Sequence, residues 1–277
     1  PGWAGIVYSA RRSESDLARE GLREYATHPL LTTVGIDRSY YAPIPLDDFR
    51  RYADQLPDGF RCCIKAPSTF TSYALGATGA PVLNQEFLSH WRLIDDLLEP
   101  CEIAFKSHTG PIVIECPPVP RGVRLDPAEF AGRLDECLTE LPHDYTYAIE
   151  LRDRALLTRE YAAVIARHGA THTYNYWSAM PLPGAQAVTV VPERLSCDAV
   201  VIRLLLRPGT RYADQREAFR PFDRLVEPDD LMRADTVALT RQALAAGKKV
   251  YLLVNNKAEG SSPLTVAALA RHLATPA

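Results

Sequence analysis

The stretch Tyr145-Thr146-Tyr147-Ala148-Ile149-Glu150-Leu151-Arg152 decides the fold of this chain. It has the pattern of a short β-strand, rich in aromatic and β-branched residues, that ends in a glutamate and an arginine just before a helix beginning near Thr158. A buried strand that delivers charge at its C-terminal end is the unit from which a (β/α) barrel builds its active site. The fold therefore depends on whether this unit recurs.

Strand and helix signals alternate through most of the 277 residues. Expected strands end in a polar or ionisable residue at the same relative position, and these residues are Asp37, Lys65, Glu115, Glu150, Asn175 and Asn255. A further strand, at residues 199–206, carries Arg203 in its middle. An open doubly wound sheet would concentrate such residues near one switch point, so their even spacing favours an α/β fold of the TIM (β/α)8-like barrel type.

A closed barrel of this type needs one more strand than the seven recognised in the pattern. Residues 5–9 are a weak candidate, so we expect the first strand to be missing or irregular in this chain. Residues 66–81 are expected to form a long loop, and residues 176–198 an irregular crossover. We expect a single TIM-barrel-like domain over residues 1–277, with an arginine-rich insertion at about 207–228.

The composition excludes several classes of protein. Apolar residues make up 47% of the chain and the formal net charge is −3, which argues against disorder and against binding nucleic acid or anionic membrane through bulk charge. No apolar run approaches the roughly 18 residues that a membrane span requires. The 6 cysteines are scattered without a C-x-x-C pair, so we expect reduced, mostly buried thiols and a cytoplasmic location.

Several short motifs, taken in order and spacing, resemble the YecE-like family, a group of proteins of unknown function. The resemblance runs through nearly the whole chain and is carried by Trp3-x-Gly5-x-x-Tyr8, Gly35-Ile36-Asp37-Arg38-Ser39-Tyr40-Tyr41, Phe60-Arg61-Cys62-Cys63-Ile64-Lys65-Ala66-Pro67, Glu115-Cys116-Pro117-Pro118, Ala148-Ile149-Glu150-Leu151-Arg152, Val201-Ile202-Arg203 and Val254-Asn255-Asn256. It implies a TIM barrel distantly similar to endonuclease IV and xylose isomerase. It also implies that residues 1–9 follow a first strand lying upstream of Pro1.

The chain departs from the family pattern at several of these motifs. Gly35 stands where the family usually has a glutamate, Asp37 replaces an asparagine and Glu115 a glutamine. The His-Gly after the arginine of strand seven is Leu205-Leu206, and the Ser-Trp after the Glu-x-Arg motif is Ala155-Leu156. The chain thus resembles a divergent member, and a shifted or lost activity stays open.

The predicted site combines acid, base and anion-binding side chains. Glu150 and Arg152 lie two residues apart, so on a strand they share a face, where a carboxylate can act as a general base and an arginine can grip an anion. Lys65 could be an electrophile, an anion clamp or a Schiff-base amine, and Arg203 an anion ligand on the pocket floor. The alternative for each is a structural ion pair that caps the barrel and meets no substrate.

The complete candidate set divides by role. The catalytic candidates are Glu150, Asp37 and Lys65, and the ligand-binding candidates are Arg152, Arg203, Tyr41, Glu115, Tyr174, Asn175, Asn255 and Asn256. We expect no metal, because the histidines fall in helices, loops or strand starts and the arginines and lysine already supply positive charge. No dinucleotide, P-loop or nucleophile-elbow motif occurs, so no cofactor is expected.

Two further segments each allow a functional and a structural interpretation. The loop at residues 257–263 could offer free amides to a phosphate, but it is equally an ordinary helix start. The insertion mixes arginines with aromatic residues, as nucleic-acid-binding segments do, yet its acidic residues nearly cancel that charge.

These observations favour a barrel protein that binds a small phosphate- or carboxylate-bearing anion at its C-terminal mouth. If it is an enzyme, metal-independent hydrolysis or isomerisation fits the candidate residues better than redox chemistry does. Two alternatives remain. One is a nucleic-acid-binding or phosphodiester-processing protein, by analogy with endonuclease IV alone, and the other is a non-catalytic scaffold barrel.

Overall fold

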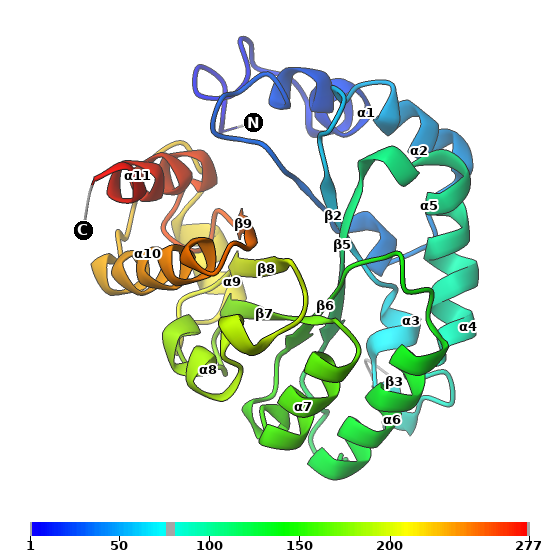
Figure 1. Cartoon of the computed structure of the whole chain (residues 1–277). Helices are drawn as coiled ribbons and strands as arrows, with labels where there is room; N and C mark the ends of the chain where they lie inside the picture. The colour runs from blue at the N-terminus through cyan, green and yellow to red at the C-terminus, as the bar shows by residue number, and fades with distance from the viewer. Residues whose placement is uncertain (1, 76–80, 276–277) are drawn as a thin grey trace.

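Seven parallel strands form one strongly curved sheet in the computed structural model, which describes residues 2–75 and 81–275. In sheet order they are β1 (Gly35–Ile36), β2 (Cys62–Lys65), β5 (Thr109–Cys116), β6 (Tyr147–Leu151), β7 (Thr171–Tyr176), β8 (Ala199–Leu204) and β9 (Lys249–Val254). Figure 1 shows the strands arranged as most of a ring, with helices around the outside. The architecture is a nearly closed barrel of the TIM type that lacks one strand, as the sequence predicted.

The surrounding helices follow the expected alternation. They are α1 (Glu14–Tyr25), α2 (Leu46–Ala53), α4 (His90–Leu93), α5 (Glu99–Ala104), α6 (Pro127–Glu140), α7 (Arg159–Arg167), α8 (Pro183–Thr189), α10 (Asp230–Ala245) and α11 (Ser262–Ala274). Caps fix several starts: the Ser13 side chain accepts a hydrogen bond from the Asp16 amide, and Thr158 accepts one from Tyr161. Gly169 lies just beyond α7 with a φ of 65°, a left-handed conformation that favours glycine.

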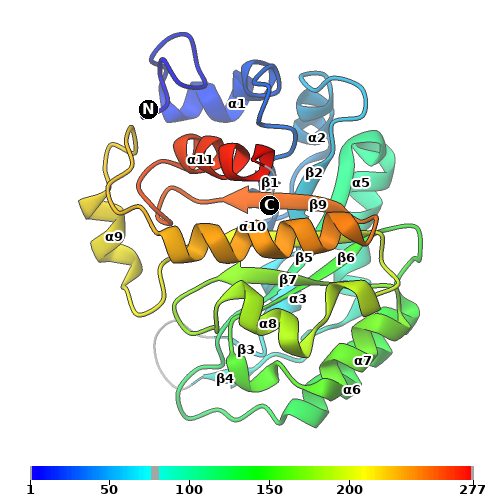
Figure 2. The ribbon, with the colours of Figure 1, turned by 60° about the vertical axis from the view of Figure 1, so that its left-hand side comes forward.

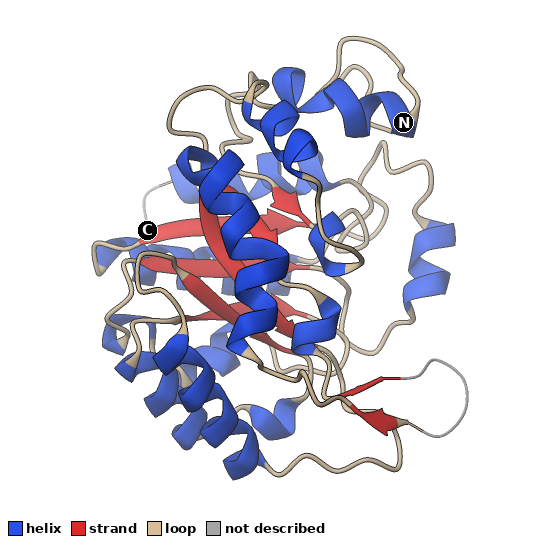
Figure 3. Ribbon diagram, turned by 90° about the vertical axis from the view of Figure 1, so that its right-hand side faces the viewer, coloured by secondary structure: helices blue, strands red, loops and turns tan. Residues whose placement is uncertain are grey.

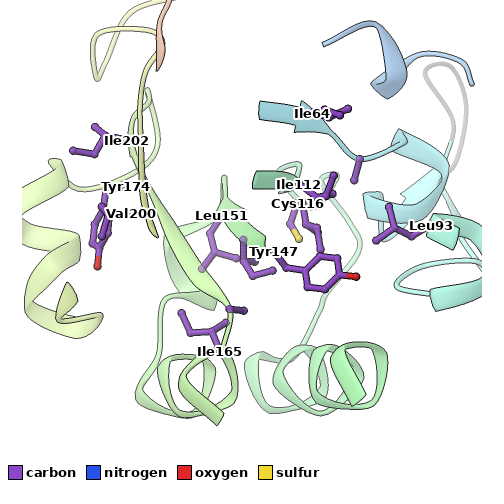
Figure 4. Packing of buried hydrophobic residues seen from close by; sticks show 14 of the residues in the cluster. Ile64, Leu93, Ile112, Cys116, Tyr147, Leu151, Ile165, Tyr174, Val200 and Ile202 are labelled. Atoms are coloured by element: carbon purple, nitrogen blue, oxygen red, sulfur yellow. The ribbon is translucent and has the colours of Figure 1, made fainter. Parts of the chain in front are cut away.

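Side chains alternate between the interior of the barrel and the layer beneath the helices, as a two-residue strand period requires. The interior holds a small cluster formed by Cys63, Val113, Ala148 and Val201. The larger core lies between strands and helices, where Figure 4 shows Ile64, Ile112, Tyr147 and Val200 among its members. Continuing the alternation toward the strand ends predicts which polar residues face inward.

The start of the barrel is irregular, as the sequence predicted. Residues 5–9 do not form a strand: Gly5 has a φ of 77°, and the amides of Ile6 and Val7 both donate to the Trp3 carbonyl, so this segment turns back on itself. Strand β1 has only two residues, and it pairs with β2 through Gly35 with Cys63 and Ile36 with Ile64.

The long loops also contain more structure than expected. Within residues 66–81 lie α3 (Ser68–Thr71) and β3 (Ala74–Leu75), which pairs antiparallel with β4 (Val82–Leu83) just after that loop. Residues 76–80 are outside the described part of the chain. The arginine-rich insertion holds α9 (Tyr212–Ala218). Figure 3 shows α9 and the hairpin projecting on the same side of the barrel.

The ring is open between its two end strands, β1 and β9. A groove with a volume of about 350 Å³ lies there, lined by both strands, α1 and α11. Figure 2 shows α11 lying between α1 and β9, over this opening. Asp37 and Arg203 line the groove as well, so it reaches the predicted site.

Candidate functional site

Six charged side chains, carried by five strands or the residues directly after them, meet at the C-terminal mouth of the barrel. They are Asp37, Lys65, Glu115, Glu150, Arg152 and Arg203, all of them predicted site residues. Register explains the meeting, since Glu115 pairs with Glu150 across β5 and β6 and all six occupy inward-facing positions. We call this set the mouth cluster.

Arg203 and Glu115 are the hubs of the mouth cluster. The Arg203 guanidinium donates to Glu150 and to Glu115 Oε2 at 3.3 Å, and its other terminal nitrogen donates to Asp37 Oδ1 at 3.3 Å. Glu115 Oε2 also lies 2.9 Å from Lys65 Nζ and 2.6 Å from Arg152 Nη2. Arg152 Nε is in turn 2.6 Å from Glu150 Oε1. Every charge in the cluster therefore has at least one opposite neighbour.

Burial is unequal within the cluster. Glu150 is fully buried and the side chains of Lys65, Glu115, Arg152 and Arg203 are at most 10% exposed, whereas the Asp37 side chain is 55% exposed. The buried members comprise three cations and two carboxylates, which leaves one net positive charge inside. Asp37 balances that charge from the solvent side.

The cations set the protonation of Glu115. Burial alone would raise its pKa, but Arg152, Lys65 and Arg203 together lower the pKa of the Glu115 carboxyl to about 2. Burial would lower the pKa of the Arg203 guanidinium, but Glu150, Asp37 and Glu115 raise it. Glu115 is thus a carboxylate at neutral pH, and so weak a base is poorly suited to proton transfer there.

Two aromatic side chains that the sequence reasoning missed cover the mouth cluster. Lys65 Nζ lies 3.6 Å from the centroid of the Tyr40 ring, and the Arg152 guanidinium carbon lies 3.9 Å from the centroid of the Trp177 ring. Trp177 lies two residues after Asn175, so strand alternation carried one step further would have predicted it. Burial, reinforced by Glu115, raises the pKa of Tyr40 to about 12, so this phenol stays protonated.

The two predicted tyrosines differ in their placement. The prediction for Tyr174 is wrong: this residue alternates with the inward-facing Asn175, so it points into the layer under the helices, where its hydroxyl donates to the Val190 carbonyl at 2.7 Å. Figure 4 shows Tyr174 among the core side chains of that layer. Tyr41 is 80% exposed and packs edge-on against Tyr40.

Asn175 is buried beside the cluster and holds two strands together. Strands β6 and β7 pair only through Ala148 with Thr171 and Ile149 with His172, and they part toward the mouth. The Asn175 side-chain amide donates to the Leu151 carbonyl at 2.7 Å and bridges that parting. This bond fixes the end of β6, which carries Glu150, against β7.

Asn255 and Asn256 organise the loop after β9. Asn255 Oδ1 accepts from the Lys257 amide at 3.1 Å, and Asn256 Oδ1 accepts from the Ser262 amide at 2.8 Å and from Trp3 Nε1 at 3.2 Å. The Gly260 amide donates to the Asn256 carbonyl at 2.7 Å. Because these amides are engaged inside the loop, the phosphate site considered for residues 257–263 gains no support.

Metal ligands are not gathered at the mouth. Among residues 2–75 and 81–275, no group of three or more His, Cys, Asp or Glu side chains is arranged to hold a metal ion. The carboxylates of the mouth cluster face cations instead. No helix within the described ranges is long and apolar enough to cross a membrane.

Two arginines of the insertion, one near each end, form ion pairs. Arg207 lies 3.1 Å from Asp229 and 3.3 Å from Glu227, and Arg224 is 3.8 Å from Asp223. These pairs neutralise part of the charge that a nucleic-acid-binding segment would use.

Fold and site together define a (β/α)-barrel protein with a buried ion-pair cluster at the C-terminal mouth. Comparison with known families gives the particular group: the model of "Protein of unknown function DUF72" matches residues 1–277, so the chain belongs to this family. The DUF72 family is the YecE-like family, so the resemblance noted in the sequence is confirmed.

Solved structures agree with this assignment. Two structures of a DUF72 family protein from Enterococcus faecalis V583 match at TM-scores of 0.64 and 0.68, with 17% and 16% identity, covering 92% and 100% of this chain and 94% of theirs in each case. A DUF72 family protein from Thermotoga maritima MSB8 matches at a TM-score of 0.68 with 15% identity, covering 99% of this chain and 95% of that one. At such identities the likeness concerns the fold. No curated protein matches the chain.

Proposed function

We propose that this protein binds a small anion bearing a phosphate or carboxylate group at the C-terminal mouth of the barrel, in the cytoplasm. The observation that carries the proposal is the charge distribution of the mouth cluster: an interior with one excess positive charge, balanced only by the exposed Asp37. The six buried free cysteines of the chain fit a reducing compartment.

Asp37 occupies the position that a ligand anion would take. Its contact with Arg203 is 3.3 Å, longer than the 2.6 Å contact between Arg152 and Glu115 inside the cluster. An ion pair with one partner half in solvent contributes about 0.2–1 kcal/mol. A phosphate or carboxylate that displaced Asp37 would therefore lose little and gain a guanidinium already fixed in place by its buried partners.

The anchors of the ligand follow from the same contacts. Arg203 presents a planar guanidinium, which suits two parallel hydrogen bonds to carboxylate or phosphate oxygens. Lys65 contacts the same Glu115 oxygen as Arg203, so the two cations are neighbours on one side of the mouth. The contacts of Lys65 with Glu115 and the Tyr40 ring support the role of an anion clamp for it over that of a Schiff-base amine.

Of the two predicted acid/base candidates, Glu150 and Asp37, the second is better suited to catalysis. Glu150 is engaged by two arginines and is enclosed, so it positions Arg152 and Arg203. Asp37 has solvent access and becomes free once an anion takes Arg203, which makes it the better placed general base. If the protein is an enzyme, metal-independent hydrolysis or isomerisation of an anionic substrate is the chemistry that this arrangement supports.

The test removes the charge of the exposed Asp37 carboxylate. Calorimetric titration with inorganic phosphate at low ionic strength should show binding to the wild type and about 3- to 10-fold tighter binding to Asp37→Asn, because the competing charge is gone. Asp47→Asn is the matched control, since Asp47 is 90% exposed and pairs with Arg50 outside the mouth.

Two results would count against the proposal. If phosphate binds neither to the wild type nor to Asp37→Asn, the mouth cluster is only a structural cap on the barrel. Equal tightening in Asp37→Asn and Asp47→Asn would show a nonspecific effect of net charge.

A further inference from the structure

Two exposed tyrosines lie on loops that leave the C-terminal mouth of the barrel. Of the 13 tyrosines in the chain, all within the described residues, Tyr41 and Tyr212 are the two that are exposed, at 80% and 51%. A single exposed aromatic side chain is ordinary on a protein surface. Here both belong to the rim of one site, which a ligand of the mouth cluster would have to pass.

Tyr41 lies on the β1 side of the rim. It directly follows the short turn of 3-10 helix η1 (Arg38–Tyr40), which begins next to Asp37. Burial raises the pKa of the Tyr41 phenol, and Asp37, Tyr212 and Glu115 raise it further. The Tyr41 hydroxyl is therefore within electrostatic reach of the mouth cluster and of the second exposed tyrosine.

Tyr212 lies on the β9 side of the rim. It is the first residue of α9, and Lys257 Nζ lies 4.4 Å from the centroid of its ring. Lys257 belongs to the loop after β9, which begins where the Asn255 amide donates to the carbonyl of Leu204, the residue after Arg203. Figure 2 shows α9 beyond the end at which β9 finishes. This side of the rim is thus both aromatic and positively charged.

The two tyrosines flank the contact at which an anion would enter. Arg203 bonds to Asp37 at 3.3 Å, on the solvent side of the mouth cluster. An anion that replaced Asp37 there would have its remaining atoms between the loop that carries Tyr41 and the loop that carries Lys257 under Tyr212.

We propose that the ligand is a planar aromatic ring that carries the phosphate or carboxylate group, with the ring stacked on Tyr41 and Tyr212 at the rim. This inference rests on the proposed function, because it takes the anion at Arg203 as given. Tyrosine rings attract other aromatic rings by offset or edge-on stacking, in addition to the gain from burying apolar area. A positive charge beside one ring also draws an anionic ligand to the rim.

The rim suits a flat ring better than a sugar. A sugar also packs on tyrosine, but its hydroxyl groups need hydrogen-bond acceptors around them. The side-chain oxygens of Asn255 and Asn256, in the loop beside Tyr212, accept from the amides of Lys257 and Ser262. These two acceptors are therefore engaged within the loop.

The test compares phenyl phosphate with cyclohexyl phosphate, which has the same number of ring carbons but no aromatic face. Calorimetric titration is performed at low ionic strength and about pH 8, where both esters are dianions. Phenyl phosphate should bind to the wild type about fivefold more tightly. The readout is the ratio of the two dissociation constants within one protein, so an effect on the phosphate group alone cancels.

The variants Tyr41→Leu and Tyr212→Leu keep an apolar side chain but remove the aromatic face. Each should lower the ratio, and the double variant should bring it below about twofold. Both sites are exposed, so the variants should fold. Tyr145→Leu is the matched control and should keep the wild-type ratio, because Tyr145 precedes β6 at the opposite end of the strands, where its hydroxyl donates to Glu102 at 2.9 Å.

Inorganic phosphate, titrated in parallel, separates this inference from the proposed function. If inorganic phosphate binds, three results would overturn the aromatic ligand alone. They are equal binding of the two esters, a preference that persists in the double variant, and binding of glucose 1-phosphate as tight as that of phenyl phosphate. If neither inorganic phosphate nor either ester binds, the anion site itself is wrong and the aromatic ligand is wrong with it.

Discussion

Replacing Arg203 by methionine should strongly destabilise the protein. The guanidinium is the partner of Glu150, Glu115 and Asp37, and without it two cations face three carboxylates at the mouth. Breaking a buried ion pair by removing one partner costs about 3–5 kcal/mol. Methionine is similar in length and apolar, so little of that cost arises from a cavity.

The magnitude can be checked because a second substitution restores the balance. In the double variant Glu150→Gln/Arg203→Met, the remaining charges are Lys65 and Arg152 against Glu115 and Asp37. We expect it to recover at least about 2 kcal/mol relative to Arg203→Met, a coupling within the range measured for contacting residues. The single variant Glu150→Gln leaves an excess cation and should bind phosphate more tightly than the wild type.

The assay is equilibrium unfolding in urea at pH 7, followed by circular dichroism. Arg159→Met is the matched control, since Arg159 is exposed at the start of α7 and should change stability by less than about 0.5 kcal/mol. A loss below about 1 kcal/mol for Arg203→Met, or a double variant no more stable than the single one, would refute the account of a tightly coupled buried cluster.

Three other predictions concern the fold. Burial lowers the pKa of His172 to about 4 although Gln186 bonds to it, so the unfolded chain takes up a proton at this residue below about pH 6.5 and the folded protein does not. The free energy of unfolding should therefore fall by about 3 kcal/mol as the pH drops from 6.5 to 4. The substitution His172→Asn should flatten this pH dependence, whereas His143→Asn, at an exposed site, should leave it unchanged. Gly110→Ala should destabilise the protein, because the new Cβ would lie 2.8 Å from the Cys62 carbonyl oxygen. In α6, the Cβ added by Gly132→Ala meets nothing within 4 Å, so this substitution should stabilise the protein by about 0.5–1 kcal/mol. Thermal unfolding that showed the reverse order would be inconsistent with the pairing of β2 with β5. Burial raises the pKa of the Cys63 thiol in β2 and of the Cys101 thiol in α5 to about 12, so the folded protein should react with a thiol reagent far more slowly than the urea-unfolded chain. Rapid reaction of native protein would show that β2 or α5 opens.

Sequence patterns predicted the barrel because the relevant signals are local. The stretch from Tyr145 to Arg152 contains its own strand signal, its terminal charges and the helix start that follows at Thr158. Seven such units and a two-residue side-chain period suffice to place Lys65, Glu115 and Glu150 at one mouth. The absence of a regular first strand was also predicted, since residues 5–9 lack a convincing strand pattern.

The errors have physical causes of two kinds. Tyr174 was placed at the mouth because it adjoins Asn175, although adjacent strand residues point to opposite faces. The balance between Lys65, Arg152, Arg203 and the carboxylates could not be predicted, because long side chains choose partners through register and reach that only three-dimensional placement defines.

The most direct measurement is the anomalous difference density of selenate in crystals grown at low ionic strength. If the mouth cluster holds an anion, the selenium peak should lie within hydrogen-bonding reach of the Arg203 guanidinium, with the Asp37 carboxylate turned away toward solvent. Selenium peaks confined to exposed lysines and arginines elsewhere, with Asp37 still bonded to Arg203, would contradict the account.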